Sequence, residues 1–246
     1  TGFLFSIPSI ASIMSPIIGG MILALSNFQK LFAASSALIA ASFLPFLLTK
    51  EHYDGMDIEI KEFMSEVNIY DFKTFFLRGF NSMGRKMFWP LYLAIIIGGS
   101  LNIGGAGSFQ ALGSALTSLF IGHVLTDANR EKVILAGFTI AAATFIAMSF
   151  ITTPLQAFLI SLINGLSFNA GIIPIYSQAM NHADHGDKLE YFALREITLA
   201  TGRITFIATA ITLFAYLPQK TSFLTGFTLL ATSVILTGHY AQKMQK

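Results

Sequence analysis

The sequence places charge inside an apolar stretch, where ionised side chains carry a large free-energy cost. Arg203 lies six residues into the stretch from about Ile197 to Leu217, roughly 9 Å deep at 1.5 Å per residue of helix. An ionised group at the centre of a bilayer costs at least ~2.5–3.5 kcal/mol and faces a cavity or a partner. Arg203 is therefore a candidate substrate-binding residue, with a structural ion pair to another helix as an equally weighted alternative.

Glu196 precedes Arg203 by seven residues, so the two side chains share nearly one helical face. They are about 10 Å apart along the axis, which predicts a shared polar network rather than a direct bond. With Arg195, Glu196 is predicted to form part of a charged gate at the cytoplasmic mouth. A stripe of threonines on the opposite face either lines a pore, packs, or bonds to the carbonyl groups four residues back. The stripe comprises Thr198, Thr201, Thr205, Thr209 and Thr212.

Two asparagines lie in the stretch from about Leu155 to Ala179. A bare amide in hydrocarbon is costly, so Asn164 faces either a cavity or a helix to which it hydrogen bonds. Asn169 lies on a different face of the same stretch. We include both among the predicted substrate-binding residues, and the interhelical hydrogen bond remains open as the alternative for Asn164.

Arg85 is a candidate because of a length argument. The apolar run Met87–Gly99 has 13 residues, too few to cross a hydrocarbon layer of about 30 Å. Its helix must therefore begin upstream, from about Thr74 or Arg78, with Pro90 as a kink. Arg85 is then a substrate-binding cation inside the span; if the span begins later, it is an ordinary flanking cation.

A short charged segment, "IGHVLTDANREK", interrupts the apolar sequence at residues 121–132. It contains Asp127, Arg130 and Lys132, and it reads as a tight cytoplasmic turn between two spans. These three residues either form part of the cytoplasmic gate or are solvated charges that set the topology.

The loop "NHADHGDK" contains His182-x-x-His185 with two aspartates, but a third metal ligand in register is not evident. We expect a solvated loop, no metal and no cofactor. The absence of cysteine excludes disulfides and thiolate metal sites. A multi-span membrane enzyme with this loop as its active site is the first alternative function.

Composition predicts an all-α membrane protein. The chain of 246 residues is 54% hydrophobic and 11% charged, with a mean hydropathy of +0.66, whereas soluble domains are about 25% charged. Backbone amides in lipid must be paired within each segment, which requires helices. We predict eight transmembrane helices, at about 3–25, 31–48, a span ending at 99, 108–125, 133–150, 155–179, 197–217 and 223–239, with a turn at 100–107.

Lysine and arginine set the predicted orientation. Successive loops fall into two sets on opposite sides of the membrane: one set is rich in lysine and arginine, and the other holds only Lys30 and Lys220. The rich loops are expected on the cytoplasmic side of the plasma membrane, with both ends of this chain inside. Residues 1–50 are expected to be the last two helices of one bundle, 51–73 a cytoplasmic linker, and 74–246 a six-helix second bundle.

The first span contains "SPIIGG", in which Pro16, Gly19 and Gly20 allow a bend and a close approach to another helix. With the 121–132 turn and the two-plus-six arrangement, it resembles the major facilitator superfamily. That family has a Gly-Pro-x-x-Gly-Gly motif in its fifth helix and a Gly-x-Leu-x-Asp-Arg-x-Gly-Arg-Arg turn in each half. Here Ser15 and Ala128 depart from those patterns. The resemblance implies that this chain is about helices 5–12 of twelve.

The resemblance implies secondary active transport of a small solute by alternating access, at a site between two bundles. The glycine motif favours an efflux antiporter. Proton drive would need a coupling carboxylate, but Glu196 is the acid nearest to the interior of these spans, so two alternatives stay open: a coupling acid in helices upstream of this chain, or passive transport. Arg85 and Arg203 suggest an anionic solute. We expect a monomer in the lipid bilayer that binds no nucleic acid. A non-transporting membrane scaffold is the second alternative.

Overall fold

The computed structural model describes residues 2–48, 68–126, 129–183 and 188–244. These residues form helices and no strands, which confirms the all-α prediction. The helices are α1 (Gly2–Leu25), α2 (Phe28–Ser42), α3 (Leu44–Leu48), α5 (Ile69–Met83), η1 (Gly84–Phe88), α6 (Trp89–Tyr92), η2 (Leu93–Ile97), α7 (Ser100–Val124), α8 (Arg130–Met148), α9 (Pro154–Ala183), α10 (Lys188–Tyr216) and α11 (Gln219–Lys243).

Four helices in the described part of the chain are long and apolar enough to cross a membrane. Their outer surface is apolar as well. On α10, Ile197, Ile204 and Ile211 recur every seven residues and are 54%, 67% and 65% exposed. Such a stripe is stable against lipid rather than water. These helices indicate a multi-pass membrane protein. The four spans are Arg130–Met148, Pro154–Met180, Tyr191–Tyr216 and Gln219–Lys243.

The helical segment before Gly98 is long, as the length argument predicts. Helix α5 begins at Ile69 and continues through η1, α6 and η2 to Ile97. Two π-helical turns, Gly84–Phe88 and Leu93–Ile97, flank the short α-helix that contains Pro90. Single π-turns relieve a disrupted hydrogen-bond ladder, and proline is one cause of such disruption. Arg85 and Lys86 therefore lie within a continuous helical rod.

The predicted turn at 100–107 is wrong. The chain turns only at Gly98 and Gly99, whose φ angles are +74° and +75°, and α7 is helical from Ser100 onward. The glycines that follow serve packing instead. A Cβ atom on Gly104 would lie 2.4 Å from the carbonyl oxygen of Pro16, so only glycine permits this approach of α1 to α7.

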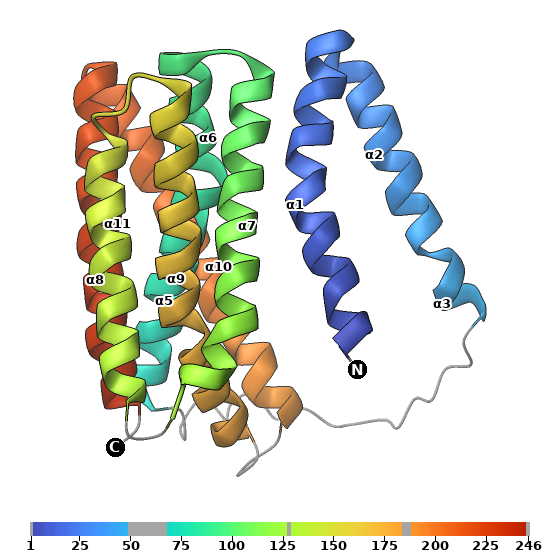
Figure 1. Ribbon diagram of the computed structural model, residues 1–246. Coiled ribbons are helices and arrows are strands. Elements are labelled where there is room, and N and C mark those ends of the chain that lie inside the picture. The colour runs from blue at the N-terminus through green and yellow to red at the C-terminus, as the bar shows by residue number, and fades with distance from the viewer. Residues whose placement is uncertain (1, 49–67, 127–128, 184–187, 245–246) are drawn as a thin grey trace.

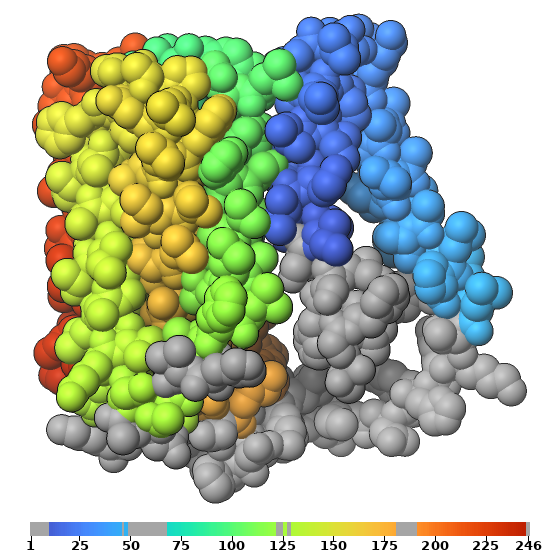
Figure 2. Space-filling view, viewed as in Figure 1, coloured from blue at the N-terminus to red at the C-terminus, as the bar shows by residue number. Residues whose placement is uncertain are grey.

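Helices α5 and α7–α11 form one bundle, and α1 and α2 stand beside it as a pair (Figure 1). Within the bundle, α9 packs against α7 and α8, α11 against α8 and α5, and α10 against α5. Helix α1 meets the bundle through α7. Figure 2 shows these two helices in contact over the upper part of the view.

The α1–α7 contact is built from backbone and small side chains. A Cβ on Gly20 would lie 2.7 Å from the carbonyl oxygen of Ser100, and a Cβ on Gly107 would lie 2.9 Å from the Cβ of Pro16. Gly19 of the same motif instead faces Leu31 of α2, at 3.8 Å. The motif thus holds α1 against α7 through Pro16 and Gly20.

An aromatic cluster fills the bundle between α6, α10 and α11. Phe88 is fully buried, and its ring centroid lies 5.2 Å from those of Phe223 and Phe227. Trp89 is 2% exposed and donates a hydrogen bond from Nε1 to Ser161 Oγ at 3.0 Å. The single tryptophan is therefore a packing residue.

Replacement of Gly113 by alanine tests the close crossing of α7 and α9. The added methyl group would lie 2.3 Å from the carbonyl oxygen of Leu162, and backbone must move to accommodate it. We expect a loss of about 1–3 kcal/mol in the free energy of unfolding in detergent. Gly19→Ala is the matched control, because its nearest contact is 3.8 Å away. Equal stability of the two variants would contradict the packing described here.

Candidate functional site

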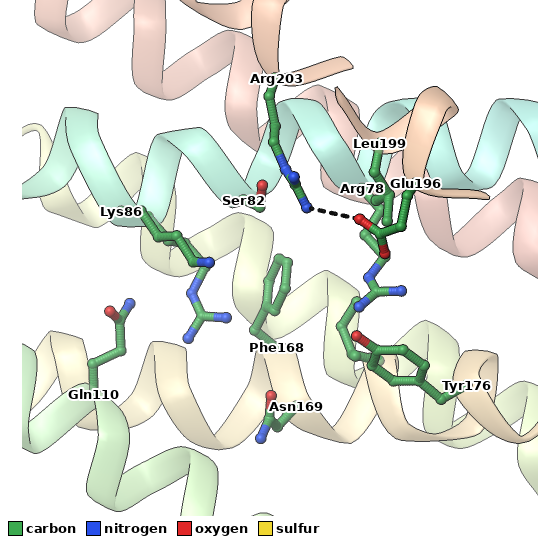
Figure 3. Close-up of a pocket in the computed structure, with 12 residues that line it drawn as sticks. Arg78, Ser82, Lys86, Gln110, Phe168, Asn169, Tyr176, Glu196, Leu199 and Arg203 are labelled. Atoms are coloured by element: carbon green, nitrogen blue, oxygen red, sulfur yellow. Dashed lines mark ion pairs between the residues drawn. The ribbon is translucent and has the colours of Figure 1, made fainter. Parts of the chain in front are cut away.

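A cavity of about 350 Å³ lies between α5, η1, α7, α9 and α10. Its wall combines apolar surface with several charged side chains, whereas the outer surface of the bundle is apolar. Labelled side chains from these helices converge on the space in Figure 3. The lining residues are Arg78, Ser82, Arg85, Lys86, Gln110, Phe168, Asn169, Ile172, Tyr176, Glu196, Leu199 and Arg203.

Two arginines in the wall are placed by aromatic rings of α9. The guanidinium of Arg85 lies 4.3 Å from the ring centroid of Phe168, and that of Arg78 lies 4.0 Å from the ring centroid of Tyr176. Cation–π contacts of this kind stabilise a desolvated cation by about 2 kcal/mol. They leave the edges of the guanidinium planes available. Arg85 Nε and Arg78 Nη1 are buried and have no hydrogen-bond partner.

The only carboxylate among the lining residues belongs to Glu196, and it already contacts two cations. Its Oε1 lies 2.8 Å from Nη2 of Arg195, and its Oε2 lies 3.8 Å from Nη2 of Arg203. The prediction of no direct bond between Glu196 and Arg203 was wrong, because the two long side chains extend toward each other and span the two helical turns (Figure 3). Arg203 is thus both in the cavity wall and ion-paired.

A chain of amide hydrogen bonds runs behind the cavity. Thr144 Oγ1 donates to the carbonyl oxygen of Ala141, so it can only accept the bond from Asn164 Nδ2 at 2.7 Å. That fixes the orientation of the Asn164 amide, whose Oδ1 accepts from Gln110 Nε2 at 3.0 Å. Gln110 itself lines the cavity, so the network connects the cavity wall to α8.

Asn164 and Asn169 have different places. Asn164 is fully buried and does not line the cavity; it joins α7, α8 and α9, which is the interhelical alternative left open by the sequence. Asn169 lines the cavity, and its Nδ2 donates to the carbonyl oxygen of Ser114 at 3.0 Å. The structure therefore brings together three of the four predicted substrate-binding residues: Arg85, Asn169 and Arg203.

The predicted gate residues are divided. Glu196 lies in the cavity wall, and Arg195 lies behind it, with its guanidinium 5.0 Å from the ring centroid of Phe192. Arg130 and Lys132 begin α8 and are not among the residues that line the cavity. Asp127 lies outside the described residues.

The threonines of α10 do not line the cavity. Hydroxyls of Thr201, Thr205 and Thr209 each donate to the carbonyl oxygen four residues earlier, at 2.8–2.9 Å. Thr212 does the same toward Ala208. This confirms the self-bonding alternative for these four threonines, whereas Glu196 and Arg203 lie on the face of α10 that lines the cavity.

Sequence reasoning identified four of the twelve residues that line the cavity and missed the other eight. Arg78 was considered only as a possible start of its span, and Tyr176, Phe168 and Gln110 were not considered as wall residues. One signal was present: Arg78 precedes Arg85 by seven residues, which places both on one helical face. The aromatic partners could not be found this way, because they lie on another helix.

A metal site finds no support in the described residues. No group of three His, Cys, Asp or Glu side chains in them could hold an ion. The loop with His182 and His185 that the enzyme alternative requires has side chains outside the described part of the chain.

Comparison with known proteins gives no family. Neither the protein-family models nor the curated proteins include a match to this chain. The function therefore has to be argued from the cavity and from the arrangement of the helices.

Removal of the Asn164 side chain tests its structural role. Asn164→Ala leaves Gln110 Nε2 without its buried acceptor, and such an unsatisfied group costs about 1–3 kcal/mol. We expect that loss in the unfolding free energy in detergent. Thr201→Val, which removes only an exposed bond within α10, is the control and should be nearly neutral. A stable Asn164→Ala protein would show that the network contributes little.

Proposed function

We propose that the protein is a secondary transporter that moves a small solute across the plasma membrane by alternating access, and that the cavity between α5, α7, α9 and α10 is its solute site. The observation that carries this proposal is the polar cavity itself. A charged hollow inside helices whose outer surface is apolar is costly unless it has a use. Its volume lies at the lower end of the range for small-molecule sites.

The helix arrangement supports a transporter with two units that move against each other, resembling the major facilitator superfamily. Helix α1 meets the bundle through α7, at a contact made by Pro16, Gly20 and Gly104 rather than by interlocked long side chains. A smooth backbone contact of this type can act as a pivot for rocking of one unit against the other. A scaffold protein would have no need for the cavity, and its interior would be filled.

Glu196 is the proposed coupling group. It is the carboxylate in the described cavity wall, and its ion pairs with Arg195 and Arg203 would weaken if it took up a proton. Proton binding would then change the balance between the two access states. The sequence motif of α1 supports outward transport. The proposal also includes eight transmembrane spans, a monomeric protein and a cytoplasmic location for both ends of this chain.

Accessibility of the cavity from the two sides of the membrane tests alternating access. The chain has no cysteine, so Ser82→Cys introduces one thiol into the cavity wall. We expect a membrane-impermeant thiol reagent to modify it in both right-side-out and inside-out vesicles. Lys220→Cys, at the exposed start of α11, should react in one vesicle type only.

One-sided reaction of the Ser82→Cys protein would contradict alternating access. The Lys220→Cys variant, prepared in parallel, excludes mixed vesicle orientation as the cause of two-sided reaction, because with mixed orientation its thiol would react in both vesicle types as well.

A further inference from the structure

The cavity has more positive charge than its own residues neutralise. Arg78, Arg85, Lys86 and Arg203 line it, whereas one lining residue, Glu196, is acidic. Glu196 contacts Arg195 and Arg203, and no ion pair involves Arg78 or Arg85 within the described residues. Lys86 is exposed and can be solvated. Neither Arg78 nor Arg85 therefore has a protein anion of its own, because the Glu196 carboxylate that also attracts Arg78 is shared with Arg195 and Arg203.

These two guanidinium groups are held in place for a ligand. Each lies over an aromatic ring, at 4.0 Å for Arg78 and 4.3 Å for Arg85, which stabilises the cation through its face. The hydrogen-bond donors lie in the plane of the guanidinium, and Arg78 Nη1 and Arg85 Nε have no acceptor. A planar fork of donors matches the oxygens of a carboxylate or a phosphate.

The two positions are separate. The guanidinium groups of Arg78 and Arg85 lie over the rings of Tyr176 and Phe168, which are eight residues apart on α9 and so about 12 Å apart along its axis. One small anion cannot form bidentate pairs with two guanidinium groups placed in this way. Two anionic groups on one molecule can, within the cavity of about 350 Å³.

We propose that the solute is a small organic dianion, whose two carboxylate or phosphate groups pair with Arg78 and Arg85. The inference rests on the proposed function only in regarding this ligand as a transported solute.

A charge series on one carbon skeleton tests the inference. Purified full-length protein in detergent is titrated calorimetrically with succinate, butyrate, 1,4-butanediol and putrescine, and with 3-phosphoglycerate, which carries one phosphate and one carboxylate, as the phosphate arm. We expect saturable binding of succinate or 3-phosphoglycerate, at least about tenfold weaker binding of butyrate, because one charged contact is lost, and no binding of butanediol or putrescine.

Variants show whether the arginines are the anion partners. Arg85→Gln and Arg78→Gln should each weaken dianion binding at least about tenfold and bring the affinities of succinate and butyrate close together, since one cation remains. A merely structural defect would weaken the binding of succinate and butyrate to the same extent. Arg85→Lys keeps the charge but loses the planar pair of hydrogen-bond donors. Its affinity for the dianion should therefore lie between those of the wild type and Arg85→Gln. Lys220→Gln, outside the cavity, should leave every affinity unchanged.

The inference is overturned if butanediol or putrescine binds as tightly as succinate, if both arginine variants keep the wild-type ratio of succinate to butyrate affinity, or if no dianion of the series binds saturably. Flux in proteoliposomes separates it from the proposed function. Arginine-dependent dianion binding without flux would refute transport but retain the anion site. Flux of a neutral or cationic solute without dianion binding would retain transport and refute the anion site.

Discussion

The free-energy cost of an ionised guanidinium inside an apolar helical bundle is the constraint on which the rest of the site depends. Each arginine of the cavity wall has a partner that reduces this cost. Tyr176 lies under Arg78, Phe168 lies under Arg85, and Glu196 lies beside Arg203. Neither ring neutralises its arginine, and the proposed anion site rests on this remaining charge. The same cost that makes these residues rare in membranes makes them informative about function.

Close packing elsewhere allows the cavity to exist. Gly113 and Gly165 bring the backbones of α7 and α9 together, and Gly79 and Gly202 do the same for α5 and α10. The aromatic cluster around Phe88 fills the adjacent part of the bundle. The hollow is therefore a local feature between tightly crossed helices, and the amide network around Asn164 supports its wall from behind.

Much of the fold followed from hydropathy, because long apolar runs have few alternatives to a membrane helix; α8 to α11 match the last four predicted spans closely. Arg85, Asn169 and Arg203 were found through the cost of polar groups in lipid. The turn at 100–107 was wrong because glycine marks turns in water but close helix contacts in a membrane. Tyr176 and Phe168 were missed because the pairing of helices α5 and α9 cannot be deduced from one sequence. The bond between Glu196 and Arg203 was missed because spacing along an axis ignores side-chain reach.

Rocking of the α1–α2 pair against the bundle is the central claim, and pairs of spin labels on the cysteine-free chain measure it directly. One pair, at positions 30 and 220, reports the end of the molecule where α2 and α11 begin; the other, at 48 and 132, reports the opposite end (Figure 1). Electron–electron double resonance should show two distance populations at each end that change in opposite directions when pH or solute is varied. A single, unchanged distance at both ends would contradict alternating access and leave the cavity a static binding site.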